Sequence, residues 1–148
     1  MKLVSACLVG VNCNFEGKNW LNKALLEEFK KGELFPVCPE VLGGLPAPRM
    51  PAEVQNGDGA EVLEGKAKVI NKRGIDVTEQ FLKGAQETLK IAKAIGATEA
   101  FLAENSPSCG CGKIFDGTFS GTTVAGDGVT AALLKKNSVK VVSMKSDH

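Results

Sequence analysis

The chain has 148 residues, of which 43% are hydrophobic and 24% charged, and its formal net charge is +1. This is the length of one ordinary domain and the composition of a soluble globular protein. The lysines are scattered among glutamates instead of forming a basic stripe, so we expect no nucleic-acid partner. No apolar run approaches the ~20 residues that cross a bilayer, so we expect no membrane partner either.

The first apolar run is too short for a secretion signal. Residues 3–6 precede Cys7 as the apolar part of a lipoprotein signal would, but signal peptides use about 7–15 apolar residues. We therefore expect a cytoplasmic protein. In that reducing compartment cysteines more often bind metal or act in catalysis than form disulfides. The odd number of cysteines, five, also argues against a closed disulfide framework.

The hydrophobic pattern alternates between strands and helices. Apolar runs predict strands at residues 2–8, 34–38, 99–103 and 139–143. Helical spacing predicts helices at residues 19–31, 76–95 and 127–136, the last two capped by Asp76 and Asp127. Of the remaining segments, we expect an irregular stretch at residues 39–59, a β-hairpin formed by residues 61–63 and 67–71, and a loop with a hairpin at residues 110–126.

This alternation predicts an α/β fold. We expect a single three-layer domain over residues 1–148, with a mostly parallel sheet, helices on both faces and a small β-hairpin insertion. Cys7, Cys38 and Cys109 each lie at or just beyond the C-terminal end of a predicted strand. These ends share the edge of an open parallel sheet where ligands bind. The three cysteines are therefore expected to converge.

The residue types and motifs that the sequence lacks exclude several kinds of catalytic site. His148 is the only histidine and the last residue, where we expect fraying, and the chain has no tyrosine. No internal imidazole is present to act as the base of a Ser–His or Cys–His hydrolase. There is neither a Walker loop nor a GxGxxG motif after a strand, so nucleotide cofactors lack support.

Cysteine chemistry remains. A free cysteine is often a small buried hydrophobe, and this alternative stays open for Cys13 and Cys111. It fits Cys38 and Cys109 less well, because both lie in turn-rich sequences that contain proline. The paired C-x₂₋₄-C motif of structural zinc sites does not occur. On spacing alone, dispersed thiolates suit zinc and an iron–sulfur cluster equally.

Polar residues near Cys38 are candidates for binding or acid–base roles. Pro39 favours an extended conformation at Cys38, and Glu40 then projects a carboxylate near any metal held there. The alternative is an ordinary solvated glutamate. Arg49 and Glu53 follow in a loop rich in glycine and proline. We expect this loop to form a pocket wall, in which a surface Arg–Glu pair is the slightly preferred interpretation.

Two further segments have both a functional and a structural interpretation. Ser106 offers a hydroxyl beside Cys109, although serine is also a common turn residue. Residues 126–128 precede the last helix, and their backbone amides are placed to approach an anion. Equally, Asp127 explains that segment as an ordinary helix cap.

Four motifs in this order resemble those of the thiouracil desulfurase family, long catalogued as a bacterial domain of unknown function. They are VSACLVG at residues 4–10, PVCPEVLGGL at 36–45 with Pro48 and Arg49 after it, SPSCG at 106–110, and GDGVTA at 126–131. Each motif alone is weak, but four in order are specific. The resemblance covers essentially the whole chain.

The resemblance implies a 4Fe–4S cluster held by Cys7, Cys38 and Cys109, with one iron that no protein residue ligates. In the family this open iron accepts the sulfur of a thiolated pyrimidine such as thiouracil. The sulfur leaves as sulfide while the base gains oxygen. The family's acid–base residues correspond to Glu40 and Ser106. The chain departs from the family at residues 14–17, where it reads Asn-Phe-Glu-Gly and many relatives read Arg-Tyr-Asp-Gly, so we expect a changed substrate pocket.

We therefore expect an iron–sulfur-dependent desulfurase acting on a small thiolated heterocycle, as a monomer or weak homodimer. An open cluster is expected to degrade in air and to be absent from a crystal grown there. Two alternatives stay open. One is a non-catalytic iron–sulfur or zinc protein that binds or senses sulfur species. The other is an interaction domain with buried thiols. Thio-modification of tRNA is disfavoured because no basic RNA-binding face is visible.

Overall fold

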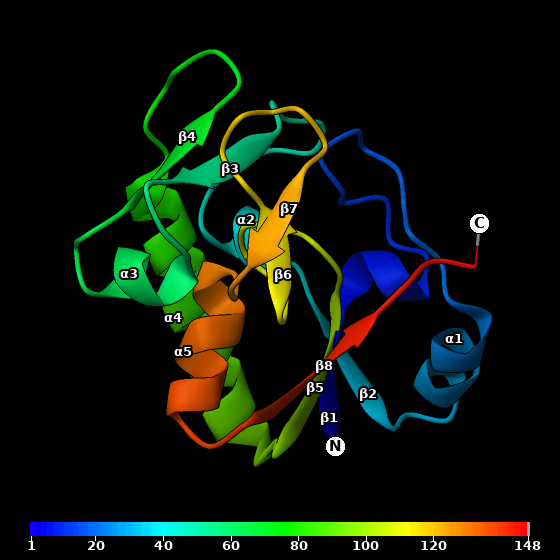
Figure 1. Cartoon of the computed structure of the whole chain (residues 1–148). Coiled ribbons are helices and arrows are strands. Elements are labelled where there is room, and N and C mark those ends of the chain that lie inside the picture. Colours follow the sequence, from blue (N-terminus) through cyan, green and yellow to red (C-terminus); the bar gives the residue numbers. More distant parts are fainter. Residues whose placement is uncertain (148) are drawn as a thin grey trace.

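Four parallel strands form the central sheet (Figure 1). Across the sheet they run in the order β2 (Leu34–Val37), β1 (Lys2–Ser5), β5 (Glu99–Ala103) and β8 (Lys140–Met144), and each neighbouring pair is parallel. The computed structural model describes residues 1–147, so the predicted fraying of His148 lies outside the described residues. The prediction of an α/β fold with a mostly parallel sheet is confirmed.

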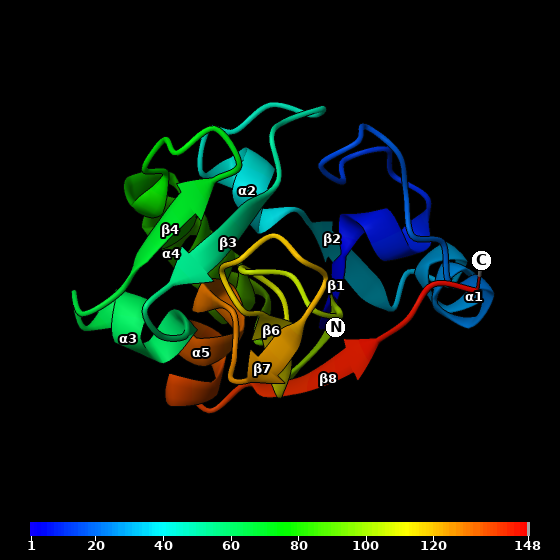
Figure 2. The ribbon, with the colours of Figure 1, turned by 45° about the horizontal axis from the view of Figure 1, so that its top comes forward.

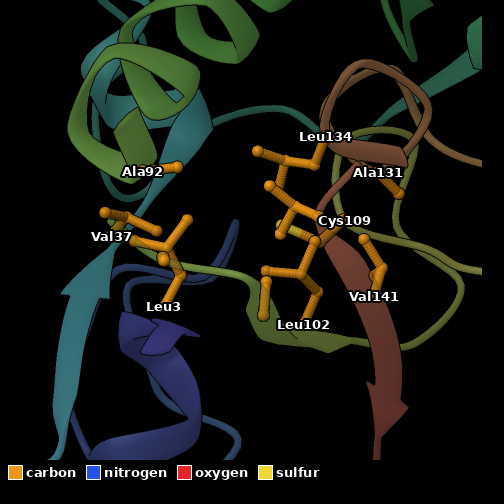
Figure 3. Packing of buried hydrophobic residues seen from close by; sticks show 11 residues of the cluster. Leu3, Val37, Ala92, Leu102, Cys109, Ala131, Leu134 and Val141 are labelled. Carbon is orange, nitrogen blue, oxygen red and sulfur yellow. The ribbon is translucent and has the colours of Figure 1, made fainter. Parts of the chain in front are cut away.

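Helices cover both faces of this sheet. Adjacent residues of a strand point to opposite faces, and Leu3 and Val4 of β1 are both fully buried. Leu3 belongs to the core cluster that includes residues of α4 (Thr78–Ile95) and α5 (Val129–Lys136) (Figure 3). Val4 belongs to the cluster on the other face, formed with α1 (Lys23–Lys30). The result is the expected three layers.

Two antiparallel hairpins extend the α4–α5 side. The first pairs β3 (Ala52–Gln55) with β4 (Lys68–Asn71), and the second pairs β6 (Lys113–Phe115) with β7 (Thr123–Ala125). Both views place β3 and β4 on the side of α4 and α5, away from α1 (Figure 1, Figure 2). A third core cluster joins these hairpins to the helices through Val54, Val69, Phe81 and Ile114.

The predicted hairpin was wrong in its first strand. Residues 61–63 belong to a helix, α3 (Gly59–Leu63), because the side chain of Asp58 caps its start by accepting from the backbone amide of Glu61. Strand β4 pairs instead with β3, which lies in the stretch expected to be irregular. That stretch also contains the short helix α2 (Pro39–Leu42).

Several predicted boundaries also move. Strand β1 ends at Ser5 and continues as the 3₁₀ turn η1 (Ala6–Val9), which therefore contains Cys7. Helix α1 begins at Lys23, later than predicted, because the Asn22 side chain caps it through Leu25 N. Val77, not Asp76, is the N-cap of α4. None of the helices formed by residues 1–147 combines the length and apolar composition needed to cross a bilayer.

Helix α2 lies with its backbone directly against that of α4. A Cβ atom added to Gly84 of α4 would lie 2.0 Å from the carbonyl oxygen of Pro39, and one added to Gly43 would lie 1.9 Å from that of Gln80. Neither position has room for a side chain. Because α2 starts directly after Cys38 and contains Glu40, this contact sets where both candidate residues stand.

We predict that Gly84→Ala destabilises the protein despite the better helix propensity of alanine. Overpacking of this kind costs about 1–3 kcal/mol, against a propensity gain of about 1 kcal/mol. A net loss in the free energy of unfolding is expected, measured by urea denaturation. Gln86→Ala, at an exposed position of the same helix, is the matched control and should change stability by less than about 0.5 kcal/mol. An unchanged or more stable Gly84→Ala variant would contradict the α2–α4 contact.

Candidate functional site

A cavity of about 900 Å³ lies at the C-terminal edge of the central sheet. The last residue of each sheet strand lines it: Ser5, Val37, Ala103 and Met144. The structure brings all five candidate site residues to this cavity, namely Cys7, Cys38, Glu40, Ser106 and Cys109. The predicted convergence of the three cysteines is therefore observed, at the edge where parallel sheets bind ligands.

Cys13 is a fourth thiol of this cavity. It is 7% exposed, and its thiol lies near those of Cys7 and Cys38. The sequence alone leaves it open as a buried hydrophobe. One feature of the sequence could have placed Cys13 at the cavity. It follows Cys7 by only six residues, so it had to lie near the same edge of the sheet. Among residues 1–147, no three His, Cys, Asp or Glu side chains are grouped as a single metal ion would require.

Three thiols of the cavity have raised pKa values. Interaction with the Cys38 side chain lowers the pKa of Cys13, but interaction with Cys7 and burial raise it to about 11 overall. Contact with Cys13 and burial raise the pKa of Cys38 well above its ordinary range. Burial raises the pKa of Cys109 to about 12. Any metal that binds these sulfurs must therefore displace their protons.

Cys38 occupies the junction between β2 and α2. Its backbone is extended, with φ −123° and ψ 98°, and Pro39 begins the helix, as expected for a residue before proline. Its half-buried thiol contacts the carbonyl oxygen of Cys13 at 3.6 Å.

Glu40 is held by Arg49. The Arg49 Nε lies 3.0 Å from Glu40 Oε2, and Nη2 donates to the same oxygen. Nη1 donates to the carbonyl oxygens of Cys13 at 2.9 Å and Pro46 at 3.1 Å. The side chains of Arg49 and Glu40 are only 8% and 16% exposed. Glu40 is therefore not a solvated surface glutamate, and the guanidinium joins three separate segments around the cavity.

Arg49 keeps its charge in this position. Burial acts to lower the pKa of Arg49, but the adjacent carboxylate of Glu40 raises it above its ordinary value. Two guanidinium nitrogens converge on one carboxylate oxygen, a charge-assisted contact. The charge of Glu40 is thus balanced at close range.

Glu53 does not pair with Arg49, so the expected surface Arg–Glu pair is wrong. The Glu53 side chain is 7% exposed, and its Oε1 accepts from the backbone amides of Gly117 at 2.9 Å and Phe119 at 3.1 Å. It therefore anchors the loop between β6 and β7. Glu53 and Phe119 both line the cavity, so this anchor positions part of its wall.

The loop that carries Cys109 is fixed at both ends. Ser106 Oγ accepts from the backbone amides of Ser108 at 3.0 Å and Cys109 at 2.9 Å. From the other side, the first amides of α5 donate to this loop: Gly128 N to Gly110 O and Val129 N to Pro107 O, both at 2.8 Å. The buried hydroxyls of Ser108 and Thr130 also hydrogen-bond, at 2.8 Å.

Both interpretations of residues 126–128 were therefore wrong. The amide of Gly128 donates to a carbonyl of the Cys109 loop and is not free for an anion. Gly128, not Asp127, is the N-cap of α5. The carboxylate of Asp127 instead accepts from the amide of Gly112 and pairs with Lys135, with contacts of 2.8 and 3.0 Å.

Cys111 lies apart from the cavity. Its thiol contacts the carbonyl oxygen of Val141 at 3.6 Å, and its side chain packs against the α4–α5 core cluster. Cys109 also packs within that cluster, among Leu102, Leu134 and Val141 (Figure 3), although it lines the cavity as well. Cys111 therefore fits the alternative of a structural thiol.

Comparisons with known proteins agree over nearly the whole chain. The protein YbbK of Bacillus subtilis (strain 168) is 46% identical over 143 residues, which cover 97% of this chain and 95% of YbbK. A solved structure, described as the 4Fe-4S-dependent thiouracil desulfidase TudS, matches with a TM-score of 0.85 and 40% identity. The match covers 96% of this chain and 89% of that one.

A family model adds the decisive match. The model described as 2-thiouracil desulfurase matches residues 3–146. This agrees with the four sequence motifs and confirms the predicted family, the enzyme class and the fold. The chain belongs to the 2-thiouracil desulfurase family.

Proposed function

We propose that the protein is a 4Fe–4S-dependent desulfurase that converts a small thiolated heterocycle, such as thiouracil, to its oxo form. The observation that carries this proposal is the meeting of Cys7, Cys38 and Cys109 with the Arg49-held Glu40 on one cavity. The family supports the reaction, and the cofactor is the one named for the solved relative TudS.

The donor set fits the cofactor. Thiolates are the ligands that iron–sulfur clusters use, and Cys7, Cys38 and Cys109 offer three from separate segments around a cavity of about 900 Å³. We propose these three as the ligands. When bound, the cluster supplies an iron without a protein ligand, a soft Lewis acid suited to a thiocarbonyl sulfur.

Glu40 is the proposed acid–base residue. Replacing C=S and H₂O by C=O and H₂S moves protons but transfers no net electrons, so a proton carrier is needed and a redox partner is not. Both contacts from Arg49 use Oε2, which leaves Oε1 to accept a proton from water. The fork of Arg49 fixes the direction in which Oε1 points.

Ser106 is the proposed hydrogen-bond donor to the substrate. Its Oγ accepts from two backbone amides, so the hydroxyl proton is left to donate elsewhere. Ser106 lines the cavity beside Cys109. These two hydrogen bonds close a turn that positions both the Ser106 hydroxyl and the Cys109 thiol.

Aromatic side chains supply a surface for a flat ring. Phe15, Trp20, Phe115 and Phe119 line the cavity, and Phe15 and Trp20 are 39% and 36% exposed. Aromatic faces stack on planar heterocycles and exclude water from the reacting atoms. These aromatic faces suit a small flat heterocycle.

We predict that Cys7→Ser, Cys38→Ser and Cys109→Ser each abolish cluster assembly. Iron and acid-labile sulfide are measured after anaerobic reconstitution, together with the thiolate-to-iron absorption. Cys111→Ser is the matched control, since Cys111 lies away from the cavity, and it should bind iron as the unaltered protein does. Cys13→Ser should also retain the cluster. Loss of iron in Cys13→Ser, with retention in one of the other three, would overturn the proposed ligand set.

We predict that Glu40→Gln retains the cluster but lowers kcat by about 10²–10⁴, because general acid–base catalysis contributes about that much. Sulfide release from thiouracil is the assay. The control is Glu16→Gln, an exposed carboxylate in a neighbouring loop, which should leave kcat unchanged. A reconstituted protein that holds iron yet releases no sulfide from thiolated bases would instead favour the non-catalytic sulfur-binding alternative.

The Arg49–Glu40 pair should be coupled in stability. Arg49→Gln leaves the partly buried carboxylate without its charged donors, and we expect a loss of about 1–3 kcal/mol in the free energy of unfolding. Glu40→Gln should cost a similar amount. The double variant should be less destabilised than the sum, with a coupling of about 0.5–3 kcal/mol from urea denaturation. If the losses in the free energy of unfolding of the two single variants simply added in the double variant, the interaction between Arg49 and Glu40 would contribute nothing to stability.

A further inference from the structure

Two buried amide atoms that belong to residues lining the cavity have no hydrogen-bond partner. They are Nδ2 of Asn14 and Oδ1 of Asn105, and they are the side-chain atoms of this kind within residues 1–147. Both residues line the cavity that contains the cysteines and Glu40. Buried polar groups are nearly always paired, so an unpaired one in a cavity wall points to a partner that arrives with the ligand.

The orientation of the Asn14 amide is determined by its neighbours. Its other atom accepts from two backbone amides, those of Glu16 at 3.0 Å and Lys18 at 2.8 Å. Because both partners are donors, that atom is the oxygen, and the unpaired atom is the NH₂ donor. Asn14 is only 5% exposed, and leaving a buried donor unpaired costs about 1–3 kcal/mol.

Asn105 presents the complementary group. It lies just after β5 and adopts the left-handed backbone conformation, with φ 63°, which asparagine tolerates better than most residues. Its backbone oxygen accepts from Phe115 N at 3.4 Å, so the β6 strand holds the residue in place. Its unpaired oxygen lies at the start of the loop that leads to Ser106 and Cys109.

We propose that Asn14 and Asn105 are specificity residues that bind the oxygen- and nitrogen-bearing edge of the substrate ring. Asn14 Nδ2 donates to a ring oxo oxygen, and Asn105 Oδ1 accepts from a ring N–H. These two residues would make the site prefer a thiolated ring with an oxo group next to a ring N–H, as in thiouracil, over a thione without an oxo group. This inference rests on the proposed desulfurase function.

The energetic argument follows from the unpaired atoms. A site built to hydrogen-bond a substrate group rejects an analogue that lacks the group, because its own buried polar atoms then stay unpaired. A ligand with an oxo group pairs the Asn14 donor. A ligand without it does not. Discrimination should therefore depend on the side chain of Asn14 and not on the sulfur chemistry.

The test compares 2-thiouracil with pyrimidine-2-thione, which keeps the sulfur but lacks the ring oxo group. The iron-loaded protein should favour 2-thiouracil in kcat/KM. Asn14→Ser keeps an oxygen to accept the turn amides but removes the amide donor, and it should reduce this preference about tenfold or more, mainly through KM. Its kcat/KM for pyrimidine-2-thione should fall much less than its kcat/KM for 2-thiouracil. Because each variant is compared on both compounds, differences in their intrinsic reactivity cancel.

A binding measurement separates recognition from turnover. Asn14→Ser and Asn105→Gly should each weaken the binding of uracil to the iron-loaded protein about tenfold or more by calorimetry. Glycine adopts the left-handed backbone of position 105 readily. The matched control is Asn56→Gly, which has the same conformation with φ 64° but does not line this cavity. Asn12→Ala is the control for the loop of Asn14.

Each outcome decides between the two proposals. Unchanged preference and unchanged uracil binding in both variants, with sulfide still released, would overturn the inference and leave the desulfurase function standing. Absence of sulfide release from either thione by every protein would overturn the function. In that case uracil binding that is lost in the two variants still supports the recognition role. If the unaltered protein fails to bind uracil, the recognition role of Asn14 and Asn105 is overturned.

Discussion

The site depends on backbones that touch where no side chain fits. A Cβ on Gly84 would meet Pro39 O, and one on Gly128 would lie 2.5 Å from the backbone of Ser108. The first contact fixes the helix that follows Cys38, and the second fixes the loop that ends in Cys109. Gly43 on the other side of the α2–α4 contact and Gly128 each belong to one of the sequence motifs, so packing explains a glycine in both. Such contacts leave the cysteines little freedom to move, which favours a site that is formed before its cofactor arrives.

The parts of the fold that could be predicted are those set by local pattern. Buried strands are visible as apolar runs, and the C-terminal ends of these runs are enough to predict that Cys7, Cys38 and Cys109 share one edge of the sheet. The strand prediction for residues 61–63 failed because a capping aspartate outweighs strand propensity over so short a segment. The prediction of Asp127 as a cap failed for a different reason. The amides that follow it take carbonyl partners from the Cys109 loop, a pairing about twenty residues away that no local pattern reveals.

The polar partners around the cavity were less predictable than its cysteines. Arg49 was expected in a pocket wall, but its choice of Glu40 over Glu53 depends on how two irregular loops meet. Glu53 instead binds the amides of the β6–β7 loop, more than sixty residues later. The departure from the family at residues 14–17 does fall on the cavity, since Asn14 and Phe15 both line it. A motif can therefore indicate that a pocket differs, while only the fold shows which side chain faces it.

The charges of the cavity give Arg49 a second role. Burial and contact among the thiols raise the pKa values of Cys13, Cys38 and Cys109. Glu40 then supplies the negative charge that Arg49 balances. The Nη1 atom of Arg49 also contacts the Cys13 carbonyl, so thiolate charge on the proposed cluster ligands would fall beside the same guanidinium. A buried arginine therefore joins Glu40, the proposed acid–base residue, to the loop that carries Cys13. Lysine would keep the charge but lose the fork that makes this link.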